Sequence, residues 1–238
     1  MERVKYAAQL LNLLVKTAYF LALAETALVD ATLAARFRKD LGKRPGDTKL
    51  FAETCRLYEA TVGVSPNVSA AVLEIVAVTK RDQCKHLVDA RDRFHHPAFD
   101  DQRLVKLGDK YFPGIIDGFR DGLQRVEFVA VESCRLIAGQ WKVKAFILMG
   151  YDIDFRSKEF ETTAPIEQFP AWEVLALSPR RKQPIPLTSY FAAKKNADRV
   201  VDVGVFDHEE KGGDRVFAYT RQVSEVQQIG GGVEKAVD

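Results

Sequence analysis

Cysteine is scarce in this sequence, which has only Cys55, Cys84 and Cys134 among its 238 residues. The three are widely spaced, no CxxC pair occurs, and an odd number of thiols cannot all pair with one another. This pattern argues against a disulfide scaffold and against a structural zinc site. Unpaired thiols are typical of a reducing compartment, so we expect a cytoplasmic protein.

The familiar phosphate-binding and hydrolase motifs are also missing. The sequence has no Rossmann or Walker glycine-rich loop, no G-x-S-x-G elbow and no H-E-x-x-H helix, so it does not support the functions that depend on them. Asp152 and Asp154 in "GYDIDF" could bind a metal, but no histidine lies nearby in the sequence to complete a site. We therefore interpret them as polar residues at a strand end, and we expect neither a metal nor a cofactor.

Long uninterrupted hydrophobic runs are lacking as well. The most apolar stretch, residues 6–35, is interrupted by Lys16, Glu25 and Asp30, which a membrane span would tolerate badly. Arg3 and a lysine precede an apolar run, as in a signal peptide, but Lys16 breaks that run and helical amphipathicity continues beyond it. We interpret the stretch as a core helix and expect no membrane partner.

An excess of either charge is absent, because 35 Lys and Arg residues face 33 Asp and Glu residues and leave a net charge of +2. Binding to a polyanion would therefore need a local basic patch. Basic residues do cluster at 36–39 with Lys43 and Arg44, at 80–81 and at 180–182. Taken singly, each cluster is best interpreted as a solvated helix end or loop.

The first half of the chain has helical periodicity. Apolar residues spaced three and four apart predict a first helix that runs to about Lys39, and glycines and a proline at 42–46 then break the pattern. Further helices are predicted from about 47 to 63, from 65 to a point before Pro97, and from 100 to 126, the last bent near its proline. Four helices joined by short loops predict an antiparallel bundle over 1–125.

The second half has a period of two and is rich in β-branched and aromatic residues. The expected strands are residues 127–137, 140–149, 171–178, 184–191, 199–206 and 214–220. They predict a small antiparallel sheet or barrel over 126–225, followed by a flexible tail at 226–238. The fold class is therefore α+β, with two domains.

The stretch "LVDARDRFHHPAFDD" stands out because two of the four histidines in the chain, His95 and His96, are adjacent at an apparent helix break. Arg91 lies on the last turn before that break, so its guanidinium could approach an imidazole. A permanent cation and a proton-transfer group are what cleavage of a phosphodiester without a metal requires. A plain alternative remains, because basic residues near a helix C-terminus also stabilise the helix dipole.

The segment "ARDRFHHP" resembles the Arg-x4–6-His signature of the HEPN superfamily, in which a polar residue commonly follows the arginine. Arg91 matches the arginine, Asp92 the polar residue and His96 the histidine. His95 departs from the pattern by offering a second imidazole, with only three residues between it and the arginine. The resemblance covers about residues 1–125, and the rest of the chain is unmatched.

The resemblance implies a metal-independent endoribonuclease that cleaves single-stranded RNA or tRNA through attack of the ribose 2′-OH, leaving a 2′,3′-cyclic phosphate. It implies that His96 acts as general base or acid, that Arg91 stabilises the phosphorane and that Asp92 orients one of them. His95 is a candidate assistant. Candidate contacts to RNA phosphates are Arg93, Lys80 and Arg81. It also implies a homodimer through the bundle, because such sites often form where two copies meet.

Two other interpretations stay open from the sequence. One is a HEPN-like scaffold or sensor that binds a protein or nucleotide without cleaving RNA. The other is an adaptor in which "RDRFHH" is only a helix end. For the β half we expect a sensor for an activating ligand or protein, a surface that positions RNA, or an oligomerisation platform. By analogy with the family, the whole chain would be a microbial toxin or antiviral defence effector.

Overall fold

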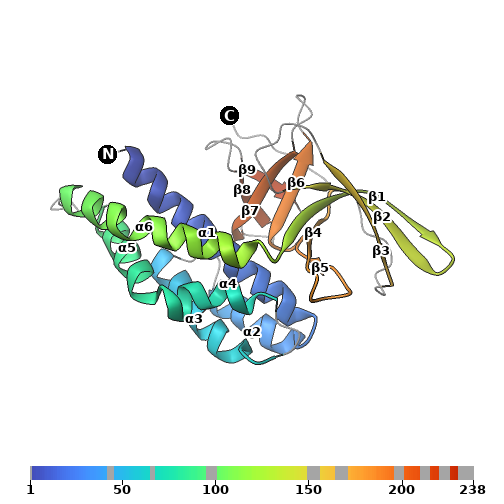
Figure 1. Cartoon of the computed structure of the whole chain (residues 1–238), viewed down its shortest axis with the longest axis horizontal. Helices are drawn as coiled ribbons and strands as arrows, with labels where there is room; N and C mark the ends of the chain where they lie inside the picture. Colours follow the sequence, from blue (N-terminus) through green and yellow to red (C-terminus); the bar gives the residue numbers. More distant parts are fainter. Residues whose placement is uncertain are drawn as a thin grey trace. The chain divides into compact units, whose positions relative to one another are not determined.

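The protein is described here from a computed structural model (Figure 1). The described residues are 2–41, 46–64, 68–94, 101–148, 156–163, 171–195, 201–209, 215–219 and 226–229. The chain divides into two compact units, Met1–Arg125 and Val126–Asp238. Helices make up the first unit and antiparallel strands the second, so the predicted α+β class is confirmed at that level.

The helical unit contains more helices than the sequence periodicity predicts. Its elements are α1 (Glu2–Ala27), α2 (Ala31–Leu41), α3 (Asp47–Thr61), α4 (Ala70–Glu74), the π-helix η1 (Ile75–Thr79), α5 (Arg81–Phe94) and α6 (Asp101–Leu123). Its described part therefore has six α-helices and one π-helix, and the expectation of four helices was too simple. α6 runs through Pro113 as one helix.

The first predicted helix is in fact two helices, α1 and α2. Asp30 ends the turn between them, and its Oδ1 accepts the N–H of Leu33 at 2.9 Å, which caps α2. Leu28 and Val29 occupy the turn and are about half exposed. Because these apolar residues continue the hydrophobic pattern of α1, the periodicity of the sequence did not predict the break.

The third predicted helix is also interrupted, by η1. The N–H of Lys80 bonds to the carbonyl of Ile75 at 2.8 Å, the wider spacing that defines a π-helix. Side chains from η1 pack against a row of glycines on α6: a Cβ on Gly118 or Gly122 would lie 3.3 or 2.9 Å from Ile75. The glycines thus allow a close approach of the two helices.

The middle of α1 forms the core of the helical unit. Its segment 18–23 is at most 1% exposed, so this part of the helix is buried on every side. By length and composition, Gln9–Ala27 could also cross a membrane, a test that buried core helices pass as well. Glu25, near the end of this segment, is buried too, and its two carboxylate oxygens accept the N–H groups of Val68 and Ser69 at 2.7 and 2.8 Å. One of the charges that interrupt the apolar run thus caps the start of α4.

The second unit contains nine described strands in two antiparallel sheets. The strands are β1 (Glu127–Ile137), β2 (Gln140–Ile147), β3 (Ser157–Thr162), β4 (Val174–Leu177), β5 (Ile185–Pro186), β6 (Phe191–Lys195), β7 (Val201–Glu209), β8 (Arg215–Tyr219) and β9 (Val226–Ile229). The first sheet has the order β3-β2-β1-β4-β5 and the second β6-β7-β8-β9. The predicted antiparallel pairing is therefore confirmed, and the strands divide between two sheets.

Three details of the β unit differ from the sequence prediction. β3 was not predicted, since its alternation of charged residues with a single phenylalanine gives a weak strand signal. The predicted strand 184–191 is divided by a turn at 187–190 into β5 and β6, which belong to different sheets. Residues 226–229, assigned to a flexible tail, pair with β8 as β9; the remainder of that tail lies outside the described residues.

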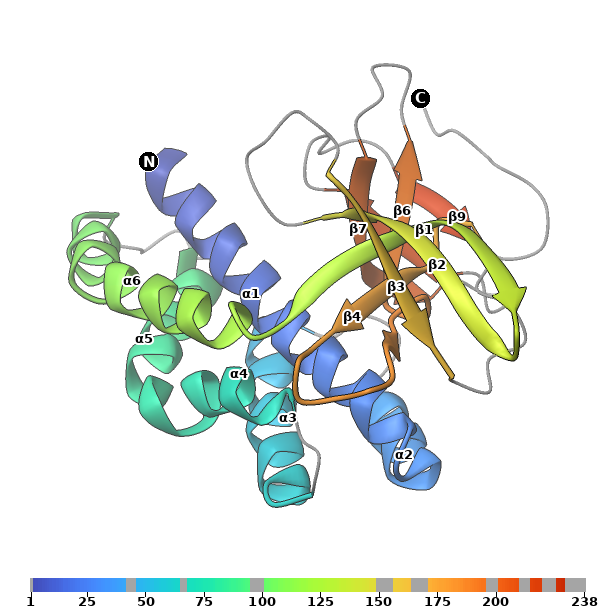
Figure 2. The ribbon, with the colours of Figure 1, turned by 45° about the vertical axis from the view of Figure 1, so that its right-hand side comes forward.

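The β1–β2 hairpin extends beyond β4, which pairs only with the first four residues of β1 (Figure 2). Ala138 and Gly139 form its turn with φ angles of 51° and 78°, the left-handed geometry that tight hairpins need. One face of the sheet carries a core cluster that includes Val129, Val143 and Leu175. Along β2 and β3 the other face carries charged side chains such as Lys142 and Glu161, whereas Ala130, Val174 and Ala176 on the same face are buried.

Candidate functional site

The Arg-x4-His motif lies at the end of α5. Arg91, Asp92 and Arg93 belong to its last turn, and their backbone is helical. The side chains of these three residues, and His95 and His96 altogether, lie outside the described residues. Asp152 and Asp154 also lie outside them.

The described side chains of α5 show which face of this helix packs against the rest of the unit. Cys84, Leu87 and Val88 are all buried, each at most 7% exposed. Position 91 comes seven, four and three residues after them. Residues at those spacings share one face of an α-helix, so position 91 falls on the same helix face as these three residues.

A small notch between α1, α3 and α5 lies beside this row. It has a volume of about 10 Å³, room for about one water molecule. The residues that line it are Leu11, Asn12, Val15, Asp47, Leu50, Phe51, Leu87 and Val88. Only two of these are polar, and they bind each other: Nδ2 of Asn12 donates to Oδ1 of Asp47. The sequence prediction missed this pair, because its members are 35 residues apart and no motif joins them.

Lys80 and Arg81, predicted to contact RNA phosphates, lie at the opposite end of α5 from Arg91. Ten positions separate Arg81 from Arg91, which corresponds to roughly 15 Å along a helix. One phosphate therefore cannot contact both ends of α5. Any RNA that reaches both must extend along the helix.

The two cations at the N-terminal end of α5 lie near buried thiols. Burial, with a smaller contribution from the nearby Cys55, raises the pKa of Cys84 to about 12 against the opposing charge of the Lys80 ammonium. Burial likewise raises the pKa of the Cys55 thiol, against the opposing charge of Arg81. Both thiols therefore stay protonated at neutral pH, and neither suits a nucleophilic role.

His86 is the histidine of α5 whose surroundings are described. Its ring stacks on that of Tyr111 from α6, with centroids 6.0 Å apart and planes 15° from parallel. The side chain is exposed, and position 86 lies five residues before position 91. His86 thus joins two helices and provides a matched control for the histidines of the motif.

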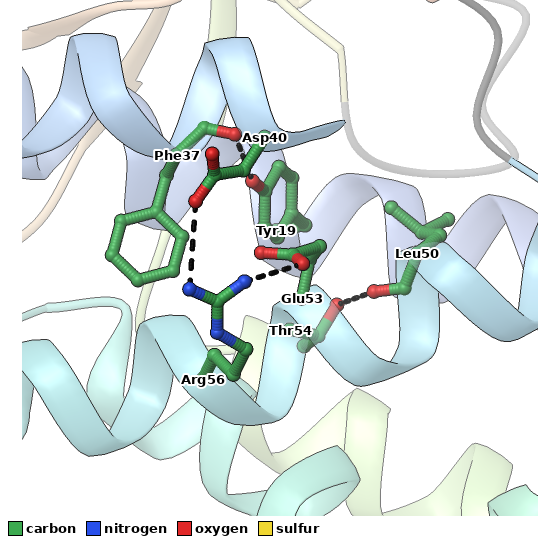
Figure 3. A network of polar contacts seen from close by, with 7 residues as sticks. All are labelled: Tyr19, Phe37, Asp40, Leu50, Glu53, Thr54 and Arg56. Carbon is green, nitrogen blue, oxygen red and sulfur yellow. Dashed lines mark hydrogen bonds and ion pairs between the residues drawn. The ribbon is translucent and has the colours of Figure 1, made fainter. Parts of the chain in front are cut away.

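Phe37, within the basic cluster at 36–39 on α2, lies beside Arg56 of α3, and Figure 3 shows these two residues. The guanidinium groups of Arg36 and Arg56 lie 5.5 and 5.7 Å from the centre of the Phe37 ring. Arg56 also pairs with Glu53 at 2.7 Å and with Asp40 at 3.4 Å. Both acidic residues thus offset the charge of Arg56, which lies outside the 36–39 cluster.

The charged face of the β unit is a second candidate surface. A groove of about 570 Å³ runs over β1, β2 and β3. Lys142 pairs across it with Glu161 at 3.3 Å, and Lys144 with Glu132 at 2.9 Å. Because basic and acidic side chains alternate in this groove, it does not have the one-sided charge of a nucleic-acid surface.

The residues Arg180–Lys182 lie in a turn after β4 and are largely exposed. They belong to the β unit, whereas the other two basic clusters belong to the helical unit. A turn of exposed cations is the ordinary solvated arrangement that the sequence suggested. Within the part of the chain that the structure describes, no group of three or more His, Cys, Asp or Glu side chains could hold a metal ion.

Comparison of the chain with family models, with curated proteins and with solved structures gave no match.

Proposed function

We propose that this protein is a metal-independent endoribonuclease that cleaves single-stranded RNA or tRNA. The observation that carries the proposal is the segment from Arg91 to His96 at the end of α5, in a unit built of helices. The proposal includes a cytoplasmic location and a homodimer through the helical unit. It also includes a role in toxicity or antiviral defence, with the β unit as the part that receives a regulatory protein or ligand.

The chemistry needs one proton acceptor, one proton donor and a cation. An imidazole of the motif takes the proton of the ribose 2′-OH, and the resulting oxyanion attacks the adjacent phosphorus. The bond from phosphorus to the 5′ oxygen breaks, and a second imidazole gives that oxygen a proton. His96 from each protomer would fill these two roles, with His95 as assistant. Arg91 stabilises the charge of the phosphorane, and Asp92 orients one of these groups.

A non-catalytic scaffold that binds a protein or nucleotide is the second candidate. The observation that favours it is the phase of α5, because position 91 shares a helix face with three buried residues. An arginine there could serve packing alone, within a private ion pair. Activity measurements on the motif residues separate the two candidates.

The test is cleavage of end-labelled single-stranded RNA and tRNA by the purified full chain in excess EDTA. Arg91→Ala and His96→Ala should each lower the rate by about a hundredfold to ten-thousandfold. His86→Ala removes a histidine of the same helix outside the motif, and it should leave the rate within about threefold because it loses only a surface contact. Cleavage that survives both motif substitutions contradicts the mechanism. Absence of cleavage by the wild type, with and without candidate triggers, favours the scaffold.

A further inference from the structure

We propose that the charged groove over β1, β2 and β3 is an interface between two copies of this chain. The partner of the groove is the same groove of a second molecule, so the contact is isologous. This inference goes beyond the proposed function, which places a dimer contact in the helical unit, and it does not depend on RNA cleavage. Its basis is the placement of Arg135 and Glu159, which both line the groove.

The groove is lined by six charged side chains, three of each sign. Four of them form the two ion pairs that cross the strands. The other two are Arg135 and Glu159, and both residues are exposed. Neither of these forms an ion pair with another residue that the structure describes, although Glu159 has a weaker electrostatic interaction with Lys144. One cation and one anion of the groove are therefore available to a partner.

The strand register places these two charges on one face, on opposite sides of β2. Arg135 of β1 lies opposite Lys142, and Glu159 of β3 lies opposite Lys144. The strands β1 and β3 are two strand spacings apart, about 10 Å. Arg135 and Glu159 are therefore held apart within one molecule, with the available positive charge on β1 and the negative charge on β3.

The neighbours of each charge favour a partner of the opposite sign. Arg135 lies directly opposite Lys142, and like charges in that arrangement destabilise a sheet. Glu159 shares the edge strand β3 with Glu161, which is two residues further along and therefore on the same face. An acid placed over Arg135 and a base placed over Glu159 would relieve both repulsions.

A second copy of the chain supplies both partners at once. A two-fold axis that passes over the middle of β2 exchanges the positions of Arg135 and Glu159 in two facing molecules. Sheets that pack face to face lie about 10 Å apart, a distance that two long side chains can bridge. The contact would contain two Arg135–Glu159 pairs and would cover Ile137, which lines the groove and is 48% exposed. A face with both signs of charge thus complements its own copy.

The experiment measures the molar mass of the full chain by size exclusion with light scattering, at several protein concentrations. Arg135→Glu and Glu159→Arg each place like charges against each other in the proposed contact. Each should weaken self-association by about a hundredfold or more and lower the mass of the wild-type assembly. The double variant should recover the wild-type mass, and so should an equimolar mixture of the two single variants, because opposite charges then meet again. Arg180→Glu, in the exposed turn after β4, is the matched control and should behave as wild type.

Recovery in the double variant also shows that the single variants do not act through misfolding. If the helical unit dimerises as well, the single variants should remain dimers; otherwise they should be monomers. A monomeric wild type, a mass that the single variants leave unchanged, or a double variant that does not recover would each overturn the proposal. RNA cleavage is not measured, so failure of the proposed function would leave this test intact.

Discussion

Glu25 of the helical unit and Glu173 of the β unit are both buried carboxylates, and they differ in how they are satisfied. Glu25 in α1 binds two backbone N–H groups with its two oxygens. Glu173, just before β4, accepts one hydroxyl hydrogen bond, from Thr188 at 2.8 Å. Burial raises the pKa of the Glu173 carboxyl, and the bond from Thr188 only partly opposes that. Both oxygens of Glu25 are therefore satisfied by backbone N–H groups. The burial of Glu173, by contrast, has a desolvation cost that its one hydrogen bond only partly offsets.

The hydrophobic cores of the two units also differ in how they are built. The helical unit is organised around one helix whose middle is buried on every side. In the β unit the core cluster draws one or two residues from each of several strands. A substitution in the middle of α1 should therefore affect the whole helical unit. The candidate motif lies on α5 of this unit. The following predictions test that difference, from the largest expected effect to the smallest.

Leucine truncation in each core should separate the two units. Leu21→Ala in α1 and Leu175→Ala in β4 each create a cavity at a fully buried site, at a cost of about 2–5 kcal/mol. We expect Leu21→Ala to lower the unfolding transition of the helical unit alone, and Leu175→Ala that of the β unit alone. Calorimetry of the full chain would resolve the two transitions. A single transition that both variants shift equally would show that the units unfold together.

Removal of the Glu25 charge should destabilise the helical unit. In Glu25→Gln the amide has only one oxygen, so one of the N–H groups of Val68 and Ser69 is left buried without an acceptor. The expected loss is about 1–3 kcal/mol in the free energy of unfolding. Glu59→Gln, at an exposed position of α3, should change it by less than about 0.5 kcal/mol. Equal effects in urea denaturation would contradict the capping role.

Two glycines of α6 should respond in opposite directions to alanine. Gly108 has nothing within 4 Å of an added Cβ, so Gly108→Ala should stabilise the helix by about 0.5–1 kcal/mol. At Gly122 the new Cβ would lie 2.9 Å from Cδ1 of Ile75. The forced shift of that side chain should outweigh the gain, so Gly122→Ala should lower stability and lie about 1–2 kcal/mol below Gly108→Ala. Equal urea midpoints would show that η1 and α6 pack loosely.

Neutralising Glu173 should have the smallest effect and the opposite sign to Glu25→Gln. A carboxyl with a raised pKa in the folded state binds its proton more tightly there than in the unfolded chain. The folded state is therefore favoured at low pH and loses stability as the pH rises from the unfolded value of about 4.5. Glu173→Gln should stabilise the β unit at pH 7 and have little effect at pH 4. Tm measured across this range checks it, and a loss of stability at pH 7 would contradict the burial argument.

The sequence was sufficient for the change from helices to strands near residue 126, because the hydrophobic period switches there. It was not sufficient for the break after α1, since Leu28 and Val29 continue the apolar pattern through a turn. The π-helix was equally hidden, because its geometry depends on packing of Ile75 against glycines of α6. β3 was not predicted because its one large apolar residue, Phe160, lies between charged residues and gives a weak strand pattern.

The candidate site also has one part that the sequence predicts and another part that it does not. The motif on α5 could be found from the sequence because its residues are close together along the chain. The pair of Asn12 and Asp47 could not, because only the packing of α1, α3 and α5 brings the two residues together beside Leu87. Contacts between distant segments carry the information that a motif leaves out.

The most direct measurement compares an RNA oligonucleotide with the same sequence made with 2′-deoxyribose, in excess EDTA. The account predicts that the full chain cleaves only the RNA and that the product ends in a 2′,3′-cyclic phosphate. Both properties follow from attack by the 2′-OH, with imidazole groups moving the proton. Cleavage of the deoxyribose strand, or an RNA product that ends in a 3′-OH, would contradict it.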